Sequence, residues 1–147
     1  MDFTIIIDSR EQQPYSFDCS TSVRKLEAGD YSVAGHEHRI AVERKSLPDF
    51  VHTVIHDAPR FRNELAKLAD CQFACVAVEA DLDQVLRGLR QSDLRLVTQA
   101  AVLGAALHIA VHHRIPVYWC GSRKAACAFT EAFLRMAVRA GGEGVAA

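Results

Sequence analysis

Residues 29–49, GDYSVAGHEHRIAVERKSLPD, contain the clearest strand pattern of the chain and predict a β-hairpin. Between residues 38 and 45 successive side chains alternate in direction, so apolar ones can face a core while charged ones face away. If residues 35–38 form the turn, Tyr31 lies opposite Val42. A slip of one residue would move apolar side chains of one arm onto the polar face of the other, so the pattern predicts this register. The predicted apolar face consists of Tyr31, Val33, Ile40 and Val42.

The opposite face of this hairpin carries a candidate site. The register sets Asp30 against Glu43, and Lys45 lies on the same side. Carboxylates on opposed residues, about 4.5–5.5 Å apart at Cβ, repel each other unless a cation neutralises them. Mg²⁺ accepts one or two carboxylates together with water and substrate phosphate. Asp8, at the end of an apolar stretch, is placed to approach the same edge. This set suits metal-assisted phosphodiester hydrolysis, although a solvated salt-bridge cluster is the alternative.

The order of the other predicted elements indicates an α/β sandwich with a mixed sheet. Strands come first in the chain, and helical periodicity begins at Ser46, where Asp49 has the spacing of a helix start and so has a structural alternative. The last helix is predicted to stop at Gly141–Gly142. The predicted strands are 3–8, a strand over 23–33 broken near Gly29, 38–45, 71–79 and 115–120, with a loop over 9–22; the predicted helices are 46–55, 58–69, 82–89, 92–113 (capped by Ser92) and 122–140.

Length, charge and cysteine content limit the class of protein. The chain has 147 residues and a net charge of -1, which fits one domain without the basic excess typical of nucleic-acid binders. No apolar stretch reaches the length of about 18 residues that a membrane helix needs, and the N-terminus lacks the basic region of a signal peptide. Five cysteines without a C-x-x-C pair favour reduced thiols. We therefore expect a cytoplasmic or nuclear protein that is neither secreted nor bound to a membrane.

Four short motifs together resemble the nuclease domain of XPF-type structure-specific endonucleases. That family has a Gly-Asp pair, a variable spacer and then Glu-Arg-Lys-x-x-x-Asp. The resemblance implies the PD-(D/E)xK superfamily and a restriction-endonuclease-like three-layer sandwich, in which helices flank a central mixed β-sheet. The motifs are IIIDSRE (5–11), GDY (29–31), VERKSLPD (42–49) and RFRNEL (60–65).

The same resemblance implies roles for individual residues. Asp30 and Glu43 would be metal ligands, Lys45 the catalytic lysine, and Asp8 a further acidic residue at the metal. The implied cofactor is Mg²⁺ or Mn²⁺. Supporting or DNA-contacting roles fall to Arg10, Glu11, Arg44, Asp49 and Arg60.

The expected activity is metal-dependent DNA endonuclease cleavage at branches, flaps or forks during repair or recombination. The alternative within the family is an inactive DNA-binding or dimerisation subunit. We expect a nuclease domain over residues 1–140, a flexible tail over 141–147 and no helix-hairpin-helix domain. In the family, nuclease domains pair through their C-terminal helices, so a homodimer is also expected. The stripe that would form it is Phe129, Phe133 and Met136, unless this stripe packs on the sheet.

Overall fold

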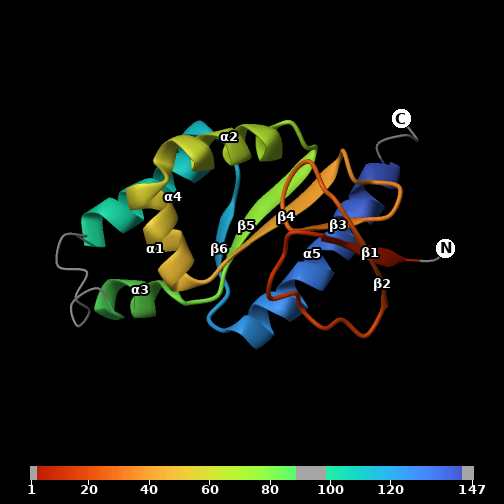
Figure 1. Cartoon of the computed structure of the whole chain (residues 1–147), viewed down its shortest axis with the longest axis horizontal. Coiled ribbons are helices and arrows are strands. Elements are labelled where there is room, and N and C mark those ends of the chain that lie inside the picture. Colours follow the sequence, from red (N-terminus) through yellow and green to blue (C-terminus); the bar gives the residue numbers. More distant parts are fainter. Residues whose placement is uncertain (1–2, 89–98, 144–147) are drawn as a thin grey trace.

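Six strands and five helices are present in the computed structural model, which describes residues 3–88 and 99–143 (Figure 1). In chain order they are β1 (Thr4–Asp8), β2 (Ser20–Arg24), β3 (Tyr31–Val33), β4 (Ile40–Lys45), α1 (Leu47–His56), α2 (Ala58–Ala69), β5 (Phe73–Val78), α3 (Leu82–Gly88), α4 (Gln99–His112), β6 (Val117–Trp119) and α5 (Arg123–Glu143).

The strands form one mixed sheet in the order β2-β1-β3-β4-β5-β6. β1 pairs in parallel with β2 and antiparallel with β3, and β3 pairs antiparallel with β4. β5 is parallel to both β4 and β6. The sheet therefore brings the end of β1, the start of β3 and the end of β4 side by side.

Helices cover the two faces of the sheet and complete three layers (Figure 1). On one face α5 packs through Ala126, Leu134 and Ala137 against the apolar side of the hairpin. On the other face a larger core joins α1, α2, α3 and α4 to β4 and β5. The predicted three-layer α/β sandwich with a central mixed sheet is confirmed.

The hairpin has the predicted register. Tyr31 is paired with Val42 across β3 and β4, and the predicted apolar face lies in the core beneath α5. Gly29 has φ of +72°, in the left-handed region that favours glycine. A Cβ at Gly29 would also lie 2.9 Å from the carbonyl oxygen of Val42. Glycine at this position lets the chain turn tightly into Asp30.

The structure corrects the sequence predictions at three places. Residues 20–22, predicted as loop, belong to β2, an exposed edge strand whose side chains show no apolar alternation. The predicted strand over 23–33 is interrupted over residues 25–30 rather than only near Gly29. α5 continues through Gly141 and Gly142 to Glu143, and a Cβ at Gly141 would lie 3.0 Å from Arg39 Nη2, so the absence of a side chain there leaves room for the guanidinium. The predicted cap at Ser92 and the tail beyond Glu143 lie outside the described residues.

The predicted α5 stripe is divided between core and surface. Phe129 and Phe133 are partly buried against the core beneath α5, whereas Met136 is 59% exposed. The five cysteines are free thiols, as predicted. Within residues 3–88 and 99–143, no helix combines the length and apolar character that membrane spanning requires.

Candidate active site

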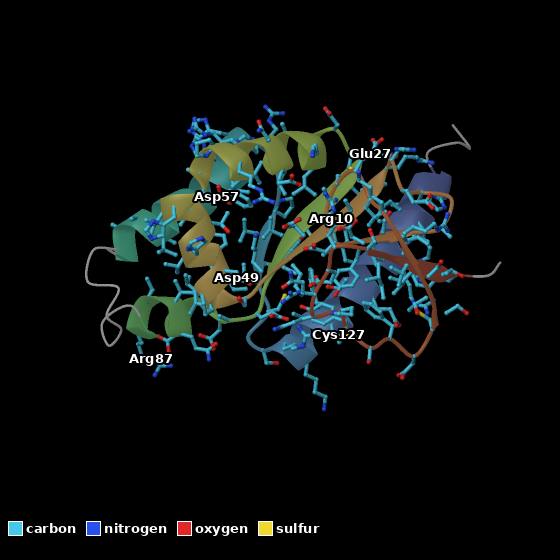
Figure 2. The ribbon with its side chains drawn as sticks, in the orientation of Figure 1. Arg10, Glu27, Asp49, Asp57, Arg87 and Cys127 are labelled. Atoms are coloured by element: carbon cyan, nitrogen blue, oxygen red, sulfur yellow. The ribbon has the colours of Figure 1, made fainter. Side chains whose placement is uncertain are left out.

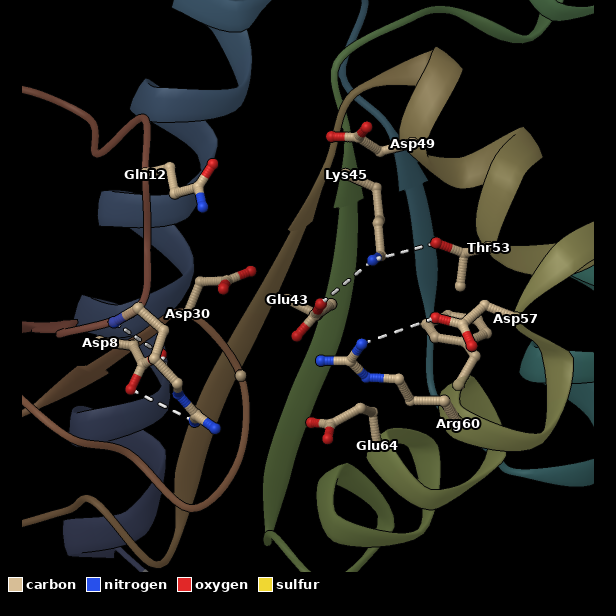
Figure 3. Close-up of a pocket in the computed structure, with 13 residues that line it drawn as sticks. Asp8, Gln12, Asp30, Glu43, Lys45, Asp49, Thr53, Asp57, Arg60 and Glu64 are labelled. Atoms are coloured by element: carbon tan, nitrogen blue, oxygen red, sulfur yellow. Dashed lines mark hydrogen bonds and ion pairs between the residues drawn. The ribbon is translucent and has the colours of Figure 1, made fainter.

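A cleft of about 490 Å³ lies between the sheet and the first two helices (Figures 2 and 3). The ends of β1 and β4, the residues before β3 and the loop after β1 form one side, and α1 and α2 form the other. Six carboxylates and three cationic groups line it, which leaves an excess of three negative charges when all are ionised. The acidic residues are Asp8, Asp30, Glu43, Asp49, Asp57 and Glu64, and the basic ones are Arg10, Lys45 and Arg60.

Backbone hydrogen bonds fix Asp30 at the point where β3 begins. Its N–H donates to the carbonyl oxygen of Val42 (2.8 Å), and its own carbonyl oxygen accepts from the N–H of Asp8 (2.8 Å). The N–H of Arg44 donates to Asp30 Oδ2 at 2.8 Å. The carboxylate of Asp30 therefore continues the hairpin ladder beyond β3 and lies beside Glu43.

Glu43 and Lys45 form the floor of the cleft (Figure 3). Glu43 is only 9% exposed, and its Oε1 lies 3.6 Å from Lys45 Nζ. Lys45 Nζ also donates to Thr53 Oγ1 at 3.4 Å and lies 5.3 Å from the centre of the Phe61 ring. Helix α1 and helix α2 thus hold the lysine over the carboxylates, as the alternation along β4 predicts.

Burial raises the pKa values of both hairpin carboxyl groups. The pKa of Asp30 is raised to about 6, chiefly because burial removes water from the charged form. Burial, followed by the negative charge of Asp30, raises the pKa of Glu43 to about 8. Lys45 supplies one positive charge for two buried carboxylates. Such a pair favours either proton uptake or a bound cation.

Asp8 lines the same cleft, but its carboxylate already has several partners. Oδ1 accepts from the N–H of Leu26 at 2.8 Å, and Oδ2 accepts from Arg10 Nε at 2.9 Å. Asp8 is 3% exposed. It ties the loop that carries Arg10 to the end of β1, and its role as a third metal ligand stays a prediction.

The helical wall contributes both predicted and unexpected residues. Asp49 lines the cleft, and its N–H donates to Ser46 Oγ at 3.2 Å, so it also lies in the capped first turn of α1. Arg60 lies on α2, with its guanidinium extending into the cleft, 3.9 Å from Asp57 Oδ2 (Figure 3). Asp57 and Glu64 were missed, although their spacings of three and four from Arg60 indicate a shared helix face.

Two predicted residues lie on the other side of the sheet. Arg44 projects away from the cleft and makes two hydrogen bonds to the Glu11 carboxylate, of 2.9 and 2.8 Å. A third bond, of 3.0 Å, joins Arg44 Nη1 to Glu79 Oε1. Glu79 was not predicted as a site residue. Its neighbour Val78 pairs with Lys45 across the parallel β4 and β5, which brings the ends of both strands together.

Asp30 and Glu43 fit Mg²⁺ or Mn²⁺ in the chemistry of their donors. The parts of the chain that the structure describes contain no cluster of three or more His, Cys, Asp or Glu that could hold a metal. Mg²⁺ nevertheless commonly takes only one or two carboxylates and completes its octahedron with water and phosphate. The paired buried carboxylates meet that requirement, whereas both oxygens of Asp8 already accept hydrogen bonds, from Leu26 and Arg10.

The three-layer fold and the carboxylate–lysine cleft beside the hairpin define a restriction-endonuclease-like nuclease domain. The model of the ERCC4 domain matches residues 7–133. The chain belongs to the ERCC4 domain family, and the predicted XPF-type nuclease domain is confirmed. A comparison with curated proteins finds no match.

Two solved structures of XPF from Aeropyrum pernix share the fold. XPF from Aeropyrum pernix superposes with a TM-score of 0.71 at 20% identity, over 92% of this chain and 65% of that one. The structure described as XPF from Aeropyrum pernix in complex with DNA gives 0.71 at 19% identity, over 93% and 66%. The chain thus spans just under two thirds of the length of these structures, and the similarity establishes the fold.

Proposed function

We propose that the protein is a divalent-metal-dependent DNA endonuclease whose catalytic residues are Asp30, Glu43 and Lys45. The observation that carries this proposal is the pair of buried carboxylates on the cleft floor, with Lys45 Nζ 3.6 Å from Glu43. Membership of the ERCC4 domain family supports the activity. The shared fold with an XPF that has been solved in complex with DNA supports DNA as the substrate.

The proposed mechanism assigns one task to each group. Mg²⁺ or Mn²⁺, when bound, would supply Lewis acidity and lower the pKa of a coordinated water. Asp30 and Glu43 would hold the cation, with Asp8 as a further acidic contributor. Lys45 orients the attacking water or offsets the charge that develops on the phosphate. Thr53 and Phe61 limit the directions in which its ammonium can point.

DNA binding is proposed to involve both walls of the cleft. Arg10 comes from the loop after β1 and Arg60 from α2, so each wall of the cleft offers one cationic group to a DNA phosphate. The excess of carboxylates between them would repel DNA until a cation is bound. We therefore expect DNA affinity to depend on the divalent metal.

The finer substrate and assembly proposals follow the family resemblance. Branched, flap or fork DNA is the proposed substrate class, with repair or recombination as the process. A homodimer through α5 is proposed, for which the exposed Met136 and the partly exposed Tyr118 beside Phe129 offer apolar contact. Sedimentation of wild type and Met136→Glu tests the dimer, because a buried glutamate would dissociate it.

One experiment separates the proposed enzyme from an inactive subunit. Purified protein is incubated with flap, fork and linear duplex DNA in Mg²⁺, Mn²⁺ or EDTA, and both binding and cleavage are measured. Metal-dependent cleavage of flap or fork DNA supports the enzyme. Binding without cleavage in any metal would favour the DNA-binding subunit, against which the complete Asp30, Glu43 and Lys45 set argues. Absence of both binding and cleavage would refute both functions.

A further inference from the structure

Glu79 is the centre of a polar cluster on the face of the sheet opposite the cleft. Its Oε1 accepts from Arg44 Nη1 at 3.0 Å. Its Oε2 accepts from the Tyr15 hydroxyl at 2.7 Å and from Arg123 Nη1 at 3.2 Å. Burial and the Glu79 carboxylate raise the pKa of Tyr15, so this phenol remains a hydrogen-bond donor at neutral pH. Both carboxylate oxygens of Glu79 therefore accept hydrogen bonds, and the three donors come from different parts of the chain.

Arg123 closes this cluster from the first turn of α5. Its Nη2 donates to the carbonyl oxygens of Gln13 at 2.7 Å and Pro14 at 3.1 Å. Its guanidinium also lies 4.7 Å from the centre of the Tyr15 ring. One side chain thus joins α5, the end of β5 and the loop after β1.

Two side chains bonded to Glu79, those of Arg44 and Tyr15, connect the cluster to residues of the cleft. Arg44 stands between Glu43 and Lys45 on β4. Tyr15 stacks on Tyr31, the neighbour of Asp30, with ring centres 5.2 Å apart and planes 5° from parallel. The Tyr15 N–H donates to the Tyr31 hydroxyl at 2.9 Å. A displacement of the cluster would therefore reach both hairpin carboxylates.

We propose that Tyr15, Glu79 and Arg123 are positioning residues, which set the placement of Asp30, Glu43 and Lys45 through Tyr31 and Arg44. This inference rests on the proposed function, in which those three residues bind metal and cut DNA. Arg123 is the informative member because its side chain is 44% exposed. Its partner Glu79 is 8% exposed but keeps its bonds from Arg44 and Tyr15, so the urea midpoint is measured beside cleavage to separate an effect on the cleft from unfolding.

The chain contains a closely matched control on the same helix. Arg135 is 43% exposed, lies 3.3 Å from Glu131 and stacks on the Phe3 ring at 4.1 Å. It therefore resembles Arg123 in its own exposure and in its aromatic contact, whereas its partner Glu131 is 31% exposed and the partner of Arg123, Glu79, is 8% exposed. Within residues 3–88 and 99–143, Arg135 forms no hydrogen bond to Glu79 or to the loop that carries Arg10 and Gln12, so its loss should leave the cleft unchanged.

The test compares Arg123→Gln, Arg135→Gln and Tyr15→Phe with wild type. Single-turnover cleavage at saturating DNA should fall about tenfold to a hundredfold in Arg123→Gln, as expected for a misplaced catalytic group. Tyr15→Phe, which removes only the hydroxyl bonded to Glu79, should fall less. Arg135→Gln should cleave as wild type does, and cleavage by each variant is compared at a urea concentration of zero, well below the urea midpoint measured for that variant.

Mn²⁺ binding without DNA, measured by electron paramagnetic resonance, separates this inference from the proposed function. Arg123→Gln should bind Mn²⁺ several-fold more weakly than wild type and Arg135→Gln. If wild type cuts DNA and Arg123→Gln matches it in rate and Mn²⁺ affinity, the positioning role is wrong. If wild type does not cut DNA, the proposed function is wrong, and the positioning role is then judged from Mn²⁺ affinity alone. Equal Mn²⁺ affinities of wild type and Arg123→Gln would overturn that role, whereas weaker binding by Arg123→Gln would support it.

Discussion

The two faces of β4 both carry buried carboxylates and cationic side chains, but the charges are balanced on one face and unbalanced on the other. Beneath α5, two carboxylates and two guanidinium groups are balanced, and Arg44 makes three bonds of 3.0 Å or less. In the cleft, Glu43 and Asp30 share one lysine, whose Nζ is 3.6 Å from Glu43. A buried charge costs free energy unless it is paired. The balanced face therefore stabilises the fold, whereas the cleft face retains negative charge that only a proton or another cation can neutralise.

The largest effect should come from removing the unbalanced groups. Asp30→Asn and Lys45→Ala should each lower DNA cleavage in Mg²⁺ by on the order of a thousandfold or more, because electrostatic stabilisation is usually the largest catalytic contribution. Circular dichroism should show an unchanged fold. Arg87→Ala, which removes an exposed ion pair on α3, serves as the control and should keep the wild-type rate. Retained cleavage in both cleft variants would refute the proposed site.

Breaking the balanced face should affect stability instead. Arg44→Met leaves Glu11 and Glu79 buried without their shared partner, at a cost of about 3–5 kcal/mol in urea unfolding at pH 7. Lys45→Met, on the cleft face, should cost clearly less, because Glu43 with its raised pKa can take up a proton instead. Equal losses in the two variants would mean that the two faces do not differ as described.

The comparison also predicts how stability depends on pH without metal. An acid whose pKa is raised on folding binds its proton more tightly in the folded state. Its contribution to stability is therefore full below the ordinary pKa, at about pH 4, and is lost as pH rises through about 6 for Asp30 and about 8 for Glu43. In EDTA at pH 8, Asp30→Asn should therefore be about 1–2 kcal/mol more stable than wild type.

Urea unfolding of wild type and Asp30→Asn between pH 4 and 9 tests this pH dependence. The two curves should converge near pH 4, where the carboxyl group is neutral in wild type as well. Adding Mg²⁺ should reduce the difference at pH 8, since a cation stabilises the ionised carboxylates. A wild-type protein that gained stability with rising pH over this range would contradict the raised pKa values.

The smallest effect concerns the wall of the cleft. Arg60→Gln should weaken DNA binding a few-fold. It should also reduce the slope of log affinity against log salt concentration by about one, as expected for one lost phosphate contact. Arg62→Gln is the control, because Arg62 is also exposed on α2 but does not line the cleft. Fluorescence anisotropy in Ca²⁺ at several salt concentrations measures both variants. An equal loss in the two would assign the effect to overall charge.

The sequence predicted those elements whose pattern is local and apolar, and it missed those that depend on exposed or distant residues. The hairpin was predictable because alternation over 38–45 and the turn at 35–38 are local and together allow only one register. β2 was missed because its side chains are largely exposed, so an edge strand leaves no apolar pattern. The end of α5 was misjudged because glycine usually terminates a helix, whereas the environment of Gly141 depends on the distant Arg39.

The residues of the candidate site likewise include some that a local pattern predicts and others that it does not. Asp30, Glu43 and Lys45 follow from spacing within one hairpin, and the structure brings them together in the cleft. The cluster around Glu79 could not be inferred, because Glu79 and Arg123 follow Arg44 by 35 and 79 positions along the chain. Their proximity depends on the parallel pairing of β4 with β5 and on the placement of α5, which no local pattern specifies.

The alternation of side chains along β4 also limits insertions and deletions within this strand. Inserting or deleting one codon within residues 40–45 would exchange the two faces, sending Arg44 into the cleft and its acidic neighbour beneath α5. The turn over 34–39 has no such constraint, since it lies at the far end of the hairpin from the cleft. Length variation among descendants of this sequence should therefore accumulate in the turn and be absent from the strand.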